Sequence, residues 1–157
     1  AYAEEHLRIL SGFYGVLKPL DGVVPYRLEM QAHLAVGDKK DLYGFWGDKL
    51  YRELMEGNED GIILNLASQE YSCAVQPYAE LSCRFITVSF EEERDGKRKQ
   101  KGTPAKMARG EMERFLAENG VKEMEGVKQF DAMGYRYRAE LSDERHFVFV
   151  KEGDLQC

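Results

Sequence analysis

Closely spaced glycines and prolines interrupt an apolar segment near the start of this chain, residues 7–30. Both residue types break regular helices and strands, because glycine frees the backbone torsions and proline restricts them. The interrupting residues are Gly12, Gly15, Pro19, Gly22 and Pro25. The segment is nevertheless rich in Leu, Val, Phe and Tyr, which predicts a closely packed loop instead of a flexible linker.

The overall composition is that of an ordinary globular protein. The chain has 157 residues, 43 % apolar and 32 % charged, which is enough to bury a core, so a single domain spanning residues 1–157 is the expectation. The formal net charge of −6 argues against an electrostatic grip on nucleic acid by the whole molecule. Any nucleic-acid binding must therefore use a local basic patch.

The sequence predicts a cytoplasmic protein without a membrane segment. It contains no apolar run of about 18 residues and opens on no signal-peptide pattern. The cysteines, Cys73, Cys83 and Cys157, are odd in number and lack Cys-x-x-Cys spacing, which predicts reduced thiols. The scattered histidines have no metal-ligand spacing with a cysteine or carboxylate, so we predict neither a metal site nor a cofactor.

Hydrophobic periodicity predicts an α+β fold, with a mixed β-sheet and surrounding helices. Helices are expected over 3–17 (broken by glycines), 42–55, 68–75, 103–119 and within 121–130. Strands are expected over 62–67, as a central buried strand, and over 84–93, 97–101, 135–141 and 146–151, with 26–34 extended. Ser68 and Thr103 are the expected N-caps, Pro104 the first residue of its helix, and Pro77 a helix end.

The helix after Thr103 carries the first candidate site, which would bind an anion. Lys106, Arg109 and Gly110 share one stripe of that helix, beside a core-facing stripe of Ala105, Ala108, Met112, Phe115 and Leu116. A cation in the first turn opposes the helix dipole unless an anion docks there. The alternative is a solvated basic face paired with Glu113.

A basic ribbon precedes this helix. Residues 94–109 contain seven basic residues and one acidic residue, Asp95, and Asp95-Gly96 is a hairpin turn signal. The ribbon includes Lys97, Arg98, Lys99 and Lys101. It would follow phosphates and bind more weakly as salt rises. The alternative is an edge strand kept soluble by its lysines, and the flanking glutamates at 91–93 would repel DNA unless they point away.

A second candidate is a polar cluster where a predicted strand leads into a helix. Asn65 stands in an apolar strand and needs hydrogen-bond partners, while Ser68 and Glu70 lie at the next helix start. Arg27 and Glu29 would complete the cluster. The alternative is that Asn65, Ser68 and Glu70 only satisfy buried polar groups and cap the helix, and that Arg27 and Glu29 form one structural ion pair.

Several sequence blocks together resemble the YaaA family of bacterial peroxide-stress resistance proteins. The blocks are residues 7–30, LYGFWGD at 42–48, NLASQEY at 65–71 and KMARG at 106–110. The resemblance implies a cytoplasmic DNA-binding protein that protects cells from peroxide and is linked to lowered free iron. It also implies an additional N-terminal segment before Ala1, so we expect this chain to be part of a larger fold.

Two functions from different classes remain open, beside a third reading as a structural module that acts only together with its missing N-terminal part. The leading hypothesis is a double-stranded DNA-binding protein whose basic hairpin and Lys106–Arg109 helix line a cleft for phosphates. The alternative is an enzyme that acts on a nucleotide-like or other anionic small molecule, in a pocket formed by the polar cluster with Lys106 and Arg109. A chain lacking part of its fold should also expose an apolar patch or a sheet edge and self-associate.

Overall fold

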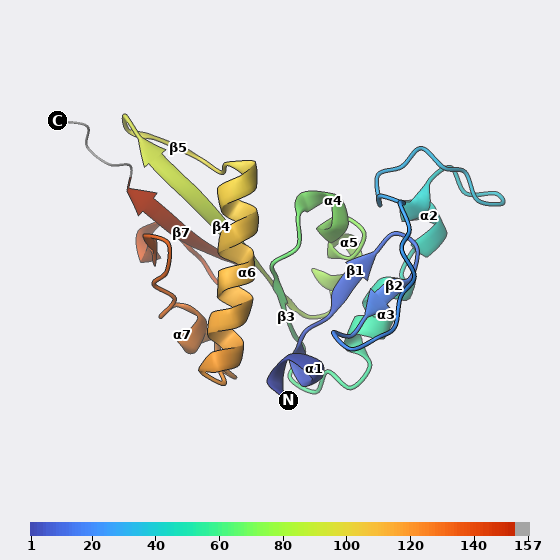
Figure 1. The fold of residues 1–157 in the computed structure, drawn as a ribbon, viewed down its shortest axis with the longest axis horizontal. Coiled ribbons are helices and arrows are strands. Elements are labelled where there is room, and N and C mark those ends of the chain that lie inside the picture. The colour runs from blue at the N-terminus through green and yellow to red at the C-terminus, as the bar shows by residue number, and fades with distance from the viewer. Residues whose placement is uncertain (153–157) are drawn as a thin grey trace. The chain divides into compact units, whose positions relative to one another are not determined.

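The computed structural model describes residues 1–152, and these form two compact units that are described separately. Unit 1 comprises residues 1–63 and 67–85, and unit 2 comprises residues 64–66 and those from 86 onward (Figure 1). Cys73 and Cys83 are free thiols, whereas Cys157 lies outside the described residues.

Unit 1 combines short helices with a small β-hairpin. The chain begins with helix α1 (Tyr2–His6) and continues into an antiparallel pair, β1 (Ile9–Ser11) and β2 (Gly15–Leu17). The helices that follow are α2 (Leu42–Trp46), α3 (Lys49–Met55), α4 (Gln69–Ser72) and α5 (Gln76–Ala79). The core consists largely of fully buried apolar side chains, among them Met30, Leu50, Val75 and Ala79.

The predicted helix over 3–17 is wrong beyond His6, and the reason is a tight turn. The Ser11 hydroxyl accepts hydrogen bonds from the backbone N–H groups of Phe13 and Tyr14, at 3.2 and 2.9 Å. Gly15 then takes a φ of +85°, and a Cβ there would lie 2.9 Å from the Trp46 ring. Only glycine fits this torsion and this approach without strain, so the backbone reverses into a hairpin.

Other boundaries in unit 1 also differ from expectation. The predicted helix over 42–55 is interrupted at Gly47, where φ is +52°, and therefore forms α2 and α3. Pro77 lies in the first turn of α5 instead of ending a helix, because the first turn needs no N–H donor there. The segment 26–34, expected to be extended, forms no strand in the described structure.

Unit 2 is built on a mixed β-sheet, which confirms the α+β class. The strands are β3 (Ile62–Asn65), β4 (Arg84–Arg94), β5 (Lys97–Lys99), β6 (Tyr135–Tyr137) and β7 (His146–Glu152), and the first two residues of β3 and of β4 are counted with unit 1. The strand order is β3-β4-β7-β6, with β5 paired to the end of β4. Strands β4 and β7 are parallel, whereas β6 pairs antiparallel with β7.

The expectation that residues 62–67 form a central strand is wrong for the described part of the chain. Strand β3 stands at the end of the strand order, and three of its four residues are only half-buried. Its short apolar run resembles a buried strand, but an apolar run does not reveal how many strands flank it. Burial on the faces and pairing at the edges are set by partners distant in sequence.

Helices and aromatic rings form the core of unit 2. Helix α6 (Gly102–Glu118) packs on the sheet, and the short α7 (Met124–Val127) follows it (Figure 1). Phe90 and Phe149 stack at 5.5 Å between ring centroids, and Phe130 meets both edge-on at 5.7 Å. The core stripe expected on α6 is confirmed at four positions, and the fifth, Phe115, is half-buried against Phe130. The four are Ala105, Ala108, Met112 and Leu116.

Candidate nucleic-acid interface

The hairpin of β4 and β5 presents the basic ribbon, and the expected Asp-Gly turn is confirmed. Asp95 and Gly96 take positive φ values of 52° and 70°, as a type I′ two-residue hairpin turn requires. The register pairs Glu92 with Lys99, Glu93 with Arg98 and Arg94 with Lys97. All three residues of β5 are exposed, as the sequence predicts.

This register separates the charges onto two faces of the hairpin. Side chains alternate along each strand, and directly paired residues point to the same side. Arg94, Lys97 and Lys99 therefore share one side, which we call the basic face. Arg98 lies on the opposite side with Glu91 and Glu93, which we call the acidic face. Two of the three flanking glutamates thus point away from the basic face.

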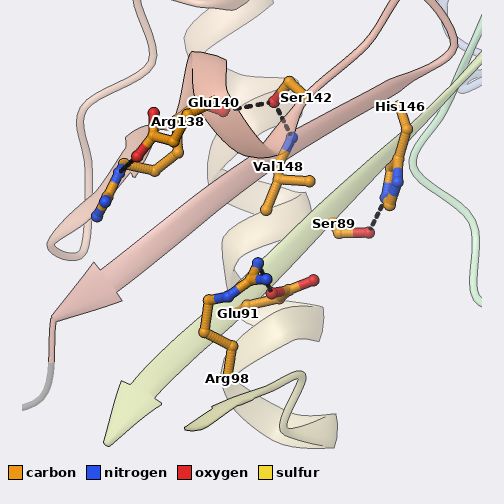
Figure 2. A network of polar contacts seen from close by, with 8 residues as sticks. All are labelled: Ser89, Glu91, Arg98, Arg138, Glu140, Ser142, His146 and Val148. Carbon is orange, nitrogen blue, oxygen red and sulfur yellow. Dashed lines mark hydrogen bonds and ion pairs between the residues drawn. The ribbon is translucent and has the colours of Figure 1, made fainter. Parts of the chain in front are cut away.

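Ion pairs neutralise some of the ribbon's cations and leave others unpaired. Arg98 binds Glu91 at 3.0 Å (Figure 2), and Lys101 binds Glu92 at 2.5 Å. Among residues 1–152, none of Arg94, Lys97 and Lys99 forms an ion pair, although Glu92, which binds Lys101, stands opposite Lys99 on the same side. Arg94 and Lys97 stand directly opposite each other, and like charges in that position repel. A bound anion would relieve this repulsion.

The start of α6 differs in detail from expectation. The helix begins at Gly102, and Lys101 occupies the N-cap position without a side-chain cap, so Thr103 is not the cap. Pro104 is therefore the third helical residue instead of the first. Since Pro104 also lacks an N–H group, few free donors remain for an anion at this end.

Lys106, Arg109 and Gly110 occupy different environments on α6. Lys106 is exposed and has no ion pair within the described residues. Arg109 is half-buried, its buried Nε has no hydrogen-bond partner there, and burial lowers the pKa of its guanidinium. A Cβ on Gly110 would meet nothing within 4 Å, so packing within the chain does not require glycine. A shared anion for Lys106 and Arg109 therefore stays a prediction.

Glu113 lies one helical turn after Arg109, and the expected alternative of a paired basic face does not describe it. Burial alone raises the pKa of the Glu113 carboxyl, and no ion pair joins it to Arg109 or Lys106 among the described residues. A raised pKa in the folded state means that folding disfavours the ionised form. The contribution of Glu113 to the free energy of unfolding is therefore most favourable at low pH, where the carboxyl is protonated. That contribution is lost as pH rises through the pKa of the folded state.

Replacing Glu113 by glutamine should accordingly stabilise the chain at pH 7, by less than about 1 kcal/mol because water still reaches the side chain. The gain should vanish in acid, where the carboxyl is protonated in both folded and unfolded states. Urea unfolding of the two proteins at pH 7 and in acid measures the difference. The exposed Glu123→Gln change removes the same charge and should show no such pH-dependent gain. A loss of stability at pH 7 would contradict this reading of Glu113.

The predicted polar cluster is only partly brought together. Glu70 accepts a hydrogen bond from the Gln31 N–H at 3.3 Å, and its backbone carbonyl accepts one from the Tyr43 hydroxyl at 2.8 Å. Burial raises the pKa of the Tyr71 phenol, and the charges of Glu70 and Glu29 raise it further. Glu29 and Glu70 therefore act on the same phenol.

The remaining members of the cluster are separate. Arg27 is exposed and forms no ion pair with a described residue, so the expected Arg27–Glu29 pair is absent there. Ser68 precedes α4, but its side chain does not cap that helix. Asn65 belongs to unit 2, where its amide donates to the Thr87 hydroxyl at 3.2 Å. This hydrogen bond agrees with the expected satisfaction of a buried polar group.

Sequence reasoning missed a row of polar contacts on the sheet of unit 2. The Ser89 hydroxyl and the His146 Nε2 lie 2.5 Å apart (Figure 2). Ser142 accepts from the Val148 N–H at 2.9 Å, and Arg138 binds Glu140 at 2.5 Å. The alternation of Thr87, Ser89 and Glu91 is visible in the sequence. The partner of Ser89 is not, because the parallel pairing of β4 with β7 joins distant segments.

Two shallow pockets in unit 2 lie away from the predicted sites. The larger has a volume of about 540 Å³ and lies beside Lys128, Phe130, Arg136 and Tyr137. Neither pocket is lined by a residue of the polar cluster or by Lys106 or Arg109. Within residues 1–152, no group of three or more His, Cys, Asp or Glu side chains is placed to hold a metal ion. No helix in the same range is long and apolar enough to cross a bilayer.

Comparison with known proteins identifies the family. Residues 1–141 match the family model described as "Peroxide stress protein YaaA". This chain belongs to the YaaA family. The match confirms the family resemblance carried by the four sequence blocks, and it places the YaaA chain among proteins named for peroxide stress.

Curated relatives of this YaaA chain carry the name "UPF0246 protein". The relative from Desulfitobacterium hafniense strain Y51 is 55 % identical over 150 residues, which are 96 % of this chain and 59 % of that protein. The relative from Agathobacter rectalis is 52 % identical over 96 % of this chain and 60 % of its own length. The relative from Pediococcus pentosaceus is 54 % identical over 96 % of this chain and 59 % of its own length. The chain thus spans about three fifths of the length of these relatives.

Proposed function

We propose that this chain is the greater part of a cytoplasmic, DNA-binding YaaA protein of the peroxide-stress response, associated with limiting free intracellular iron. The family name supports the link to peroxide stress. The link to iron rests on the family resemblance. The proposed partner is double-stranded DNA, held through its phosphates by the basic face of the β4–β5 hairpin.

The observation that carries the proposal is the unpaired charge on that face. Lys97, Lys99 and Arg94 are exposed, share one side, and form no ion pair among the described residues, because the nearby Glu92 binds Lys101 instead. A strand that used lysines only to avoid aggregation would gain nothing from placing two cations directly opposite each other. The phosphates of a DNA backbone would supply the negatively charged partners that these three cations lack within the described residues.

The proposal predicts a sequence-tolerant contact. The basic face carries two lysines and one arginine on a two-stranded ribbon, and the phosphate contacts that such cations make carry no sequence information. Affinity should therefore depend on ionic strength much more than on sequence. Because the whole chain has a negative net charge, it does not attract DNA as a whole. The salt dependence of binding should therefore come from the hairpin alone.

Fluorescence anisotropy with labelled duplexes of unrelated sequence tests the proposal directly. The unaltered chain should bind all of them with affinities within a few fold of one another, and binding should weaken about tenfold or more between 50 and 200 mM salt. An absence of binding at 50 mM salt, or binding that salt does not weaken, would contradict the proposal. A marked preference for one sequence would contradict the sequence-tolerant mode.

A further inference from the structure

Exposed apolar side chains gather in one segment of unit 1. Ten large apolar side chains are exposed among the described residues, and seven of them lie between residues 9 and 34. We call these seven side chains, which share one stretch of the sequence, the apolar surface. They are Ile9, Phe13, Leu20, Val23, Val24, Tyr26 and Leu34. Leu20 is 83 % exposed and Val24 is 65 % exposed, so this is not a partly covered core.

The segment that presents these side chains is held in place by its own contacts. The Ser11 and Tyr26 hydroxyls hydrogen-bond to each other, and the Val24 N–H donates to the Tyr14 hydroxyl at 3.0 Å. The rings of Phe13, Tyr14 and Tyr26 lie 4.9 to 5.5 Å apart. A fixed loop that holds apolar groups toward water indicates a surface built for a partner, since such patches mark interaction sites.

The same loop also has backbone donors from which no described residue accepts a hydrogen bond. The N–H groups of Val23, Tyr26 and Arg27 donate no hydrogen bond to any residue within 1–152. Such donors are normally paired or in water, and an adjoining chain segment could pair them. The side chains and the backbone therefore point to the same kind of partner, a stretch of polypeptide with apolar side chains.

The length of the relatives indicates where that polypeptide comes from. The Desulfitobacterium hafniense protein matches 96 % of this chain, yet about two fifths of its own length has no counterpart here. We propose that the apolar surface is an intramolecular docking site, covered in full-length YaaA proteins by a segment from that unmatched part. Covering it removes apolar area from water without a second molecule. This inference does not depend on DNA binding.

Hydrogen exchange compares the two lengths of chain. In this chain the amides of Val23, Tyr26 and Arg27 should exchange at nearly the rate of an unfolded peptide. The aligned amides of the full-length Desulfitobacterium hafniense protein should exchange at least about tenfold more slowly. Equally fast exchange in both would overturn the proposal. Protection that appears in this chain as its concentration rises would overturn it in favour of a second copy as the occupant.

A pair of serine substitutions provides an independent test. Leu20→Ser with Val24→Ser should change the Tm of this chain by about 1 °C or less, because both side chains already lie in water. Serines at the two aligned positions of the full-length relative should lower its Tm by about 5 °C or more. Leu81, which is 90 % exposed and outside the apolar surface, is the matched control, and its replacement by serine should alter neither Tm. An unchanged Tm of the full-length double variant would contradict the docking site.

Discussion

Replacing Phe149 by alanine is expected to destabilise unit 2 by about 4 kcal/mol. Phe149 is completely buried, and its ring contacts those of Phe90, Phe130 and Tyr137 at centroid distances of 5.5 to 5.7 Å. The substitution removes one ring from a set that joins β4, β6, β7 and the segment after α7. Both the lost transfer free energy and the residual cavity contribute to the cost.

The measurement must report on unit 2. Trp46, the single tryptophan of the sequence, lies in unit 1, so its fluorescence does not follow the altered sheet directly. Hydrogen exchange of the β7 amides under increasing urea gives the free energy of unfolding locally. Leu81→Ala, at an exposed position, should stay within about 0.5 kcal/mol of the unaltered chain. A loss below about 1 kcal/mol for Phe149→Ala would show that these rings are not the core of unit 2.

Neutralising the basic face should lower duplex affinity roughly 100-fold near 50 mM salt. The variant carries Arg94→Gln, Lys97→Gln and Lys99→Gln together, so no phosphate contact remains on that side of the hairpin. Glutamine keeps side chains of comparable length, and all three positions are exposed, so the fold should be unaffected. Anisotropy titrations of both proteins against one duplex measure the loss.

The matched control uses the other basic residues of the same ribbon. Arg98→Gln with Lys101→Gln removes cations that already neutralise Glu91 and Glu92. Their loss should reduce affinity only severalfold, through longer-range effects that salt screens. If the control variant loses as much affinity as the basic-face variant, cations already held in ion pairs matter as much as unpaired ones, and the hairpin acts only through its net charge.

The sequence predicts the features of this chain that depend on nearby residues. The Asp95-Gly96 turn and the exposed β5 follow from local turn chemistry and composition. The core stripe of α6 follows from helical periodicity. Helical spacing alone determines which residues share a face, so the stripe can be predicted without knowing what it packs against. Four of its five expected core positions are buried.

The failures arise where contacts between distant residues decide the structure. A helical apolar spacing over 3–17 is overridden after His6, because Ser11 closes a turn and Gly15 packs against Trp46. The position of β3 at the end of the strand order depends on which strands pair, and that pairing leaves no local signal.

The candidate interface shows the same limit. The basic composition of residues 94–109 is plain in the sequence, but the separation of its cations is not. Once the Asp95-Gly96 turn fixes the register, alternation assigns Lys97 and Lys99 to one face and Arg98 to the other. The pairing of Lys101 with Glu92 requires coordinates, since Lys101 lies beyond the end of β5.

The salt dependence of duplex binding tests the central proposal most directly. Each phosphate contact contributes about 0.9 to the slope of log affinity against log salt concentration. The variant Arg94→Gln, Lys97→Gln, Lys99→Gln should therefore bind with a slope shallower by about 2.7 than that of the unaltered chain, while Arg98→Gln with Lys101→Gln should change the slope by less than about 1. An identical slope for the unaltered chain and the basic-face variant would contradict the proposal that this face of the hairpin holds DNA phosphates.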